Sequence, residues 1–273
     1  MLKTRVLTAL ILLAILLPIL YMNVFLPFAL VTVVFFAAAS WENFRLFGNS
    51  KPLFATAVWT AIYAFIIFVS GLPGVQKLFW LCIALWAVRF APALRLGLPP
   101  LRHTGNRLLN ATYSIAILGC FIAAAALFQH SPLYLLSVMA VVWIADIGAY
   151  FSGKAFGRRK LAPSISPGKS WEGAIGGWLL VLICAALTTI APVLADTFPT
   201  ALQQHFGWAG LMLVMTVLVA ASIVGDLFES LLKRRADVKD SSGLLPGHGG
   251  VLDRIDALIP VLPLAALLAL WLR

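Results

Sequence analysis

Nine long apolar stretches, separated by short polar loops, constrain this chain more than any other feature. They fall at residues 6–21, 24–41, 53–71, 78–97, 108–128, 132–152, 173–195, 208–232 and 254–272. A membrane-spanning helix needs roughly 20 predominantly apolar residues, and most of these stretches reach that length. With 62% hydrophobic and only 11% charged residues, the chain carries more apolar surface than a water-soluble domain could bury. The sequence therefore predicts an all-α polytopic integral membrane protein with about nine transmembrane helices.

The basic residues predict the orientation of these helices. If the N-terminus is cytoplasmic and nine spans alternate, every one of the 20 lysines and arginines except Lys77 and Arg273 lies on the cytoplasmic side. Cytoplasmic loops of membrane proteins carry an excess of lysine and arginine. We therefore expect a cytoplasmic N-terminus and a periplasmic C-terminus. The net charge of +10 follows from this topology, so no nucleic-acid partner is expected.

The acidic residues are concentrated beside two basic cytoplasmic loops. Of the ten, only Glu42 and Asp196 lie elsewhere, in loops or at span ends, and neither is expected to have a special role. Asp146 falls inside the sixth predicted span, and Asp226 and Glu229 fall inside the eighth. A carboxylate at membrane depth is costly and usually marks a polar cavity or a functional site. The alternative is a structural ion pair between helices.

Two acid pairs have the spacing of ligands on one helix face. Asp226 and Glu229 are three residues apart, as are Asp253 and Asp256, so each pair shares a face. Carboxylate oxygens suit Mg²⁺, which proteins often share with substrate phosphates. The intervening loop holds basic side chains and a glycine turn that suit phosphate oxygens: Lys233, Arg234, Arg235, Lys239 and Pro246-Gly247-His248-Gly249-Gly250. This pattern predicts metal-assisted phosphate chemistry at a membrane surface.

The loop between the sixth and seventh predicted spans has a similar composition. Residues 164–173 combine serines, Lys169 and Glu172 just before a predicted helix, which makes an anion cradle plausible. Its Gly-Lys-Ser does not form a Walker A motif, because no glycine precedes it at the required spacing and no strand is predicted. The alternative for Ser170 and Glu172 is helix capping.

The stretch from Ser230 to Asp256 resembles the signature of phosphatidate cytidylyltransferases, also called CDP-diacylglycerol synthases. That signature has a serine, then Lys-Arg, Lys-Asp, His-Gly-Gly and finally Asp-Arg-x-Asp. All of these stand at the matching places here: Ser230, Lys233-Arg234, Lys239-Asp240, His248-Gly249-Gly250 and Asp253-Arg254-Ile255-Asp256. The segments 166–173 and 225–230 also resemble the family. The specific resemblance covers roughly residues 140–256.

The resemblance implies a multi-pass enzyme of the bacterial inner membrane with its active site facing the cytoplasm. It would convert CTP and phosphatidate into CDP-diacylglycerol and pyrophosphate in phospholipid biosynthesis. Mg²⁺ is the expected cofactor, with a second cation as an option, and membrane lipids and a homodimer are further expected partners. The alternatives are another CTP-dependent lipid-phosphate transferase and a cation transporter that uses the intramembrane acids.

The resemblance, read with the residue pattern, assigns roles within the site. Asp226, Asp253 and Asp256 are the expected metal ligands and, with Lys239 and His248, the catalytic residues. The expected substrate-binding residues are Lys169, Ser170, Ser230, Lys233, Arg234, Gly249, Gly250 and Arg254. Secondary candidates are Asp146, Glu172 and Glu229. We expect residues 1–130 to form a lipid-facing scaffold, and residues 131–273 to form the catalytic domain with cytoplasmic loops 154–172 and 233–252.

Overall fold

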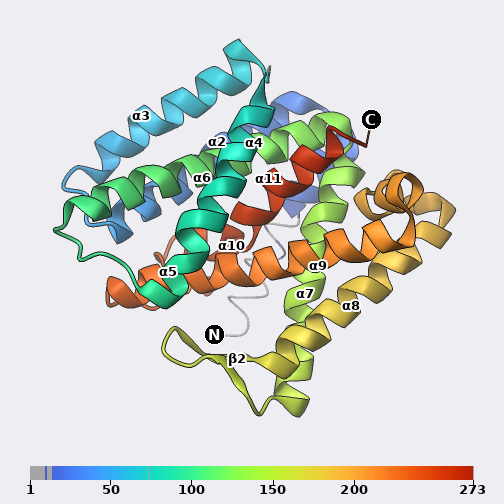
Figure 1. Ribbon diagram of the computed structural model, residues 1–273. Helices are drawn as coiled ribbons and strands as arrows, with labels where there is room; N and C mark the ends of the chain where they lie inside the picture. Colours follow the sequence, from blue (N-terminus) through green and yellow to red (C-terminus); the bar gives the residue numbers. More distant parts are fainter. Residues whose placement is uncertain (1–9, 11–13, 73, 273) are drawn as a thin grey trace.

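The computed structural model describes residues 10, 14–72 and 74–272 and shows an almost entirely helical chain (Figure 1). The α-helices are α2 (Phe25–Leu46), α3 (Pro52–Phe65), α4 (Val75–Leu85), α5 (Ala91–Leu96), α6 (Thr104–His130), α7 (Pro132–Phe156), α8 (Trp171–Ile190), α9 (Phe198–Arg235), α10 (Leu252–Ile255) and α11 (Leu258–Ala269). Short π-helical turns, Ile66–Ser70 and Trp86–Phe90, follow α3 and α4, and a 3-10 turn, Pro192–Leu194, follows α8. Within the described part, seven helices are long and apolar enough to cross a membrane. The predicted all-α membrane fold is confirmed.

Side-chain caps fix where the helices around the site begin. The Ser131 hydroxyl accepts a hydrogen bond from the backbone N–H of Tyr134 at 3.4 Å, and Pro132 occupies the first turn of α7. The Ser170 hydroxyl accepts a hydrogen bond from the Gly173 N–H at 3.2 Å and so begins α8. Such caps satisfy backbone donors that have no partner inside the helix. The capping alternative for Ser170 is therefore confirmed.

The first and the last of the nine predicted spans match the structure less well than the seven between them. The first predicted span, 6–21, lies partly outside the described residues, and residues 14–22 are helical. The ninth is divided between α10 and the 12-residue α11. At 1.5 Å per residue, α11 extends only about 18 Å, short of the roughly 30 Å hydrocarbon core. The seven predicted spans between them coincide with the seven long apolar helices.

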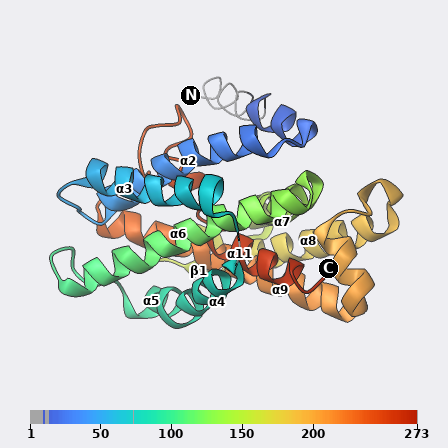
Figure 2. The same ribbon diagram turned by 90° about the horizontal axis from the view of Figure 1, so that it is seen from above.

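Protein surrounds the short helix α11. It packs against α4, α6, α7 and α9, and both views show it in the middle of the molecule (Figures 1 and 2). Most of its side chains are buried, from Leu258 to Ala269. A helix that is apolar on all sides belongs in such an interior. Seen from above, α2 and α3 lie along one side of it, and α4 and α5 along the other (Figure 2).

Glycines let α7 and α8 approach closely, which places Asp146 beside the loop that precedes α8. A Cβ on Gly148 would lie 2.8 Å from the Gly177 Cα, and a Cβ on Gly177 would lie 2.4 Å from the Ala145 carbonyl oxygen. Neither position can hold a larger residue unless the helices separate, because real Cβ contacts do not come below about 3 Å. This contact forms one wall of the candidate site.

The loop before α8 is a short hairpin, which the sequence did not predict. Strand β1 (Lys160–Ala162) pairs antiparallel with β2 (Ser166–Ser170), and the hairpin projects from one end of the molecule (Figure 1). The expectation of no strand here was wrong. Lys169 lies on β2 and Ser170 ends it, so the hairpin holds the Gly-Lys-Ser segment at the start of α8.

Candidate active site

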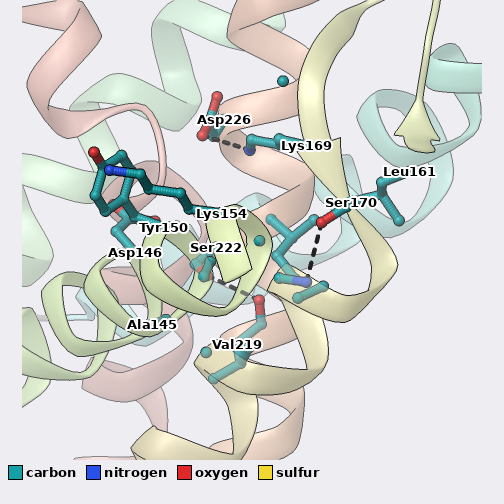
Figure 3. Close-up of a pocket in the computed structure, with 17 residues that line it drawn as sticks. Ala145, Asp146, Tyr150, Lys154, Leu161, Lys169, Ser170, Val219, Ser222 and Asp226 are labelled. Carbon is teal, nitrogen blue, oxygen red and sulfur yellow. Dashed lines mark hydrogen bonds and ion pairs between the residues drawn. The ribbon is translucent and has the colours of Figure 1, made fainter. Parts of the chain in front are cut away.

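A cavity of about 410 Å³ opens between α7, the hairpin, α8 and α9. Its polar lining includes Asp146, Lys154, Lys169, Ser222 and Asp226, which three of these elements contribute (Figure 3). Asp146 and Lys154 come from α7, Lys169 from β2, and Ser222 and Asp226 from α9. The fold therefore brings together acids and lysines that are up to 80 residues apart in the sequence (146 to 226).

Lys169 forms an ion pair with Asp226 across this cavity. The ammonium and the carboxylate point toward each other in Figure 3. About a quarter of each side chain is exposed, 27% for Lys169 and 29% for Asp226, so the pair is accessible to a ligand. The Ser230 hydroxyl donates a hydrogen bond to Asp226 Oδ1 at 3.3 Å. Three of the predicted site residues thus contact one another.

Lys233 joins two further predicted acids. Its ammonium forms an ion pair with Glu229, one helical turn earlier on α9, and with Asp253 Oδ1 at 2.6 Å. All three groups are largely buried, with 14% of the Lys233 side chain, 5% of Asp253 and none of Glu229 exposed. Charged groups that are buried need such partners to offset the loss of hydration. Lys233 therefore links α9 to the start of α10.

The segment between α9 and α10, which we call the signature loop (residues 236–251), folds around Asp253. Asp253 Oδ2 accepts hydrogen bonds from the Gly250 N–H at 2.7 Å, the Ser241 N–H at 2.9 Å and the Ser241 hydroxyl at 2.9 Å. Burial alone would raise the pKa of Asp253, but the hydrogen bonds from Lys233, Gly250 and Ser241 outweigh it and hold the pKa below its usual value. Asp253 is therefore ionised at neutral pH.

Gly249 and Gly250 allow the signature loop to turn tightly over Asp253. Gly249 has φ of +81°, and a Cβ there would lie 2.7 Å from Asp253 Oδ2. The Gly249 carbonyl accepts a hydrogen bond from the Leu245 N–H at 2.8 Å, which closes the turn. The tight turn explains why glycines stand at these two positions. The contact of Gly249 and Gly250 with substrate stays a prediction.

A second cavity, of about 390 Å³, has one polar end and long apolar walls. Asp146, Asp253, Arg254 and Asp256 line the polar end. The apolar walls come from α2, α6, α7 and α11, and include Phe28, Val31, Phe35, Phe121, Leu135 and Leu262. Asp146 lines both cavities, so the two spaces adjoin at this carboxylate.

The charged groups of both cavities form one electrostatic cluster. Asp256 interacts with Asp226, Lys169 and Lys233, and Asp146 interacts with Asp226, Lys169 and Arg254. Together with the Lys233–Glu229 pair, the two cavities hold five carboxylates and four cations: Asp146, Asp226, Glu229, Asp253 and Asp256 against Lys154, Lys169, Lys233 and Arg254. The cluster therefore has a formal surplus of one negative charge.

The predicted metal ligands have suitable oxygen donors, but lysines now engage two of them. Lys169 pairs with Asp226 and Lys233 with Asp253, while Asp256 Oδ1 accepts a hydrogen bond from the Ala257 N–H at 2.7 Å. Among the described residues, no three histidine, cysteine, aspartate or glutamate side chains come together as a ready metal site. Mg²⁺ therefore stays a prediction, which the donor type and the surplus negative charge support.

Several predicted residues lie outside this cluster. Glu172 accepts hydrogen bonds from the backbone N–H groups of Arg158 and Arg159, at 3.1–3.2 Å, and does not line either cavity. Arg234 Nε donates to the Ile165 carbonyl at 3.3 Å and so ties α9 to the hairpin. Lys239 is exposed on the signature loop. The half-buried His248 has an Nδ1 with no hydrogen-bond partner in the described part of the chain.

Glu42 is a residue of this region that the sequence analysis missed. The expectation that it has no special role was wrong, because its fully buried carboxylate accepts four hydrogen bonds from residues 241–252. One sequence signal could have indicated it, since Glu42 is the only acidic residue before Asp146. Its position near the end of a predicted span fits a buried carboxylate.

Known proteins resemble this chain over most of its length. Residues 3–272 match the cytidylyltransferase family. A phosphatidate cytidylyltransferase of Pseudomonas aeruginosa is 39% identical over 278 residues, which cover 99% of this chain and 97% of that protein. A phosphatidate cytidylyltransferase of Haemophilus influenzae is 35% identical, covering 96% of both chains. One of Bacillus subtilis is 43% identical over 152 residues, 55% of this chain and 53% of that protein. The resemblance seen in the sequence is confirmed, and the chain belongs to the cytidylyltransferase family.

Proposed function

We propose that this protein transfers the cytidylyl group of CTP to phosphatidate, giving CDP-diacylglycerol and pyrophosphate. Relatives that match almost its whole length bear the name of this activity. One structural observation supports the proposal most directly: an apolar cavity within the membrane helices ends at Asp253, Arg254 and Asp256. A phosphatidate molecule needs such a site, with apolar walls for its acyl chains and a cation for its phosphate.

The two adjoining cavities suit the two substrates. The first cavity carries Lys154 and Lys169 and adjoins the hairpin at the end of the helices, so it suits a water-soluble triphosphate. The second suits a lipid. Asp146 lines both. The phosphates of the two substrates would therefore meet near this residue, beside the Asp226–Lys169 pair.

The reaction needs positioning and charge stabilisation more than it needs a proton acceptor. A phosphate oxygen of phosphatidate is already an anion, and it would form a bond to the α-phosphorus of CTP while the bond from that phosphorus to the bridging oxygen breaks. Pyrophosphate leaves with that oxygen. Lys169, Lys233 and Arg254 would offset the negative charge of the two substrates as they approach.

The charge of the cluster supports a requirement for a divalent cation. The surplus negative charge of the cluster would repel two anionic substrates, because its four basic side chains are already outnumbered by its own carboxylates. Mg²⁺ would neutralise phosphate charge, and Asp226, Asp253 and Asp256 would hold it. The same cationic side chains argue against a cation transporter, because Lys169 and Lys233 would repel a free cation, whereas Mg²⁺ would bind together with substrate phosphates that offset their charge.

We further propose a direct transfer without a covalent nucleotidyl-enzyme. A covalent route needs an activated nucleophile. The Ser230 hydroxyl donates a hydrogen bond to Asp226 Oδ1 at 3.3 Å, but the same carboxylate is already paired with the Lys169 ammonium. Lys239 is exposed, and His248 Nδ1 has no partner within the described chain. None of the three is arranged as an activated nucleophile.

The proposed location is the inner membrane of a bacterium, with the site facing the cytoplasm. The bacterial relatives and the basic loops beside the cavity support this assignment. The test of the function is CDP-lipid formation by the purified protein from labelled CTP and phosphatidate, with and without Mg²⁺. Labelled lipid product that requires Mg²⁺ is the expected result. No product from either condition would contradict the proposal.

A further inference from the structure

We infer that Glu42 is a positioning residue that holds the signature loop in its active shape from the outside. The inference rests on the proposed function, because the loop matters only if Asp253 and Lys233 belong to the active site. Glu42 lies near the end of α2 and is fully buried. Its partners lie about 200 residues later in the chain. It therefore connects the N-terminal helices with the active-site region.

Each carboxylate oxygen of Glu42 accepts two hydrogen bonds from this region. Oε1 accepts from the Ser242 hydroxyl and from the Val251 N–H at 3.0 Å. Oε2 accepts from the Ser241 hydroxyl at 3.2 Å and from the Leu252 N–H at 2.6 Å. No lysine, arginine or histidine of the described chain forms an ion pair with Glu42. Only neutral donors therefore stabilise the buried Glu42 carboxylate, so its stabilisation depends on the loop conformation that supplies these donors.

Gly250 is shaped to fit against Glu42. A Cβ at this position would lie 2.4 Å from Glu42 Oε1 and 2.0 Å from the Ser241 hydroxyl oxygen. Both distances are far shorter than real Cβ contacts. A side chain at this position would displace the Ser241 hydroxyl and the Glu42 carboxylate from their hydrogen bonds, which gives the second glycine of the His-Gly-Gly segment a structural explanation.

Glu42 and Asp253 both accept hydrogen bonds from the segment 241–252. The Ser241 hydroxyl lies within hydrogen-bond distance of both, 3.2 Å from Glu42 Oε2 and 2.9 Å from Asp253 Oδ2. Gly250 donates its N–H to Asp253, and the next two residues donate theirs to Glu42. If Glu42 released the loop, the donors that orient Asp253 would move, and Asp253 would no longer face Lys233 in a fixed geometry.

Glu42→Gln is the most direct test because it changes charge with little change in volume. The new NH₂ group would replace one oxygen, and each oxygen faces one backbone N–H, of Val251 or of Leu252. A hydroxyl can rotate to accept a hydrogen bond, but a backbone N–H cannot. Either orientation of the amide therefore leaves one backbone donor without an acceptor.

The matched control is Asn43→Ala on the same helix. Asn43 is equally buried, and its amide donates to Ser114 at 2.9 Å and to Asn110 at 3.1 Å, both on α6. Its hydrogen bonds therefore do not reach the signature loop. The control measures what the loss of a buried polar contact on α2 does to the protein in general.

Two measurements on the purified full-length proteins decide the matter. Hydrogen-exchange mass spectrometry should show exchange in the segment 241–252 at least tenfold faster in Glu42→Gln and unchanged in Asn43→Ala. CDP-lipid synthesis should show kcat at least tenfold lower in Glu42→Gln, with KM for CTP within threefold of wild type. Glu42→Asp, which keeps the charge, should recover part of the lost kcat.

The outcomes separate this inference from the proposed function. A wild-type protein that makes no CDP-lipid would contradict the proposed function. The exchange measurement would still test whether Glu42 holds the segment 241–252. Unchanged exchange in Glu42→Gln, an equal effect in Asn43→Ala, or faster exchange with normal kcat would each overturn the positioning role. If Glu42→Gln does not fold, Ser242→Ala removes one donor to Glu42, and it should raise exchange and lower kcat by about three- to fivefold. No change in Ser242→Ala would then overturn the inference.

Discussion

Asp253→Asn is the substitution whose effect the structure predicts most directly. It keeps the size of the side chain and removes the charge. Asp253 Oδ1 faces the Lys233 ammonium at 2.6 Å, and Oδ2 accepts three hydrogen bonds from Ser241 and Gly250. The three loop donors hold Oδ2 in place, so the new NH₂ group takes the position next to Lys233. The hydrogen bond from the Lys233 ammonium to the Asp253 carboxylate is thus replaced by a contact between that ammonium and the NH₂ group, which are both donors.

The magnitude follows from this one lost contact. A hydrogen bond to a charged group contributes about 1.5–3 kcal/mol. Lys233 keeps Glu229 as a partner, so the ammonium is not left alone, and we expect the free energy of unfolding to fall by about 2–3 kcal/mol. Loss of the charge from the cluster should lower kcat by at least 100-fold, or about 2.7 kcal/mol in the activation free energy.

The assay is CDP-lipid synthesis at saturating CTP, phosphatidate and Mg²⁺, together with thermal unfolding in the same detergent. Asp237→Asn is the matched control. Asp237 is exposed on the same loop with φ of +54°, a conformation that asparagine also accepts. It should stay within twofold of wild type in both measurements. A kcat of Asp253→Asn within threefold of wild type would refute the assignment of Asp253 to the active site.

Three further predictions test the cavity, the topology and the route of transfer. Lys169→Met should lower kcat/KM for CTP at least tenfold, because it leaves Asp226 unpaired and removes a phosphate-binding cation, whereas Lys160→Met on the same hairpin should stay within twofold. Reporter fusions should place residues 154–170 in the cytoplasm and a C-terminal fusion after Arg273 in the periplasm; the opposite location of either would overturn the predicted topology. Without phosphatidate, the enzyme and Mg²⁺ should not exchange labelled pyrophosphate into CTP, and rapid exchange would instead indicate a covalent intermediate.

The sequence predicted the membrane helices well because length and composition act locally. An uninterrupted apolar stretch forms a helix wherever backbone groups cannot reach water. The eighth stretch was predicted to begin at residue 208, and the structure has the non-helical Gly207, with φ of +67°, at that place, although α9 begins earlier at Phe198. The short α11 could not be distinguished from a spanning helix, because lipid and a protein interior favour the same apolar residues.

The hairpin was missed because its strands carry little of the usual signal. Strands β1 and β2 have only three and five residues, and the sequence of β2, Ser-Pro-Gly-Lys-Ser, contains residues typical of turns. What the sequence did predict is that Lys169 and Asp226 belong to the same site, and the ion pair between them agrees with that. Long-range pairs of this kind depend on how helices pack, which local patterns do not encode.

Glu42 and Asp253 show where prediction from the sequence has to stop. Both are buried carboxylates that accept several hydrogen bonds from the same loop. Asp253 stands in a dense local pattern of acids, bases and glycines, so its spacing alone suggested a role. Glu42 stands among apolar residues, and its partners come from a segment that only the folded chain brings beside α2. The difference in chemistry is that Asp253 faces a cation and a cavity, whereas Glu42 faces only neutral donors. Asp253 is therefore placed to interact with charged groups in the site. Glu42 is placed to hold the loop whose N–H and hydroxyl groups donate hydrogen bonds to Asp253.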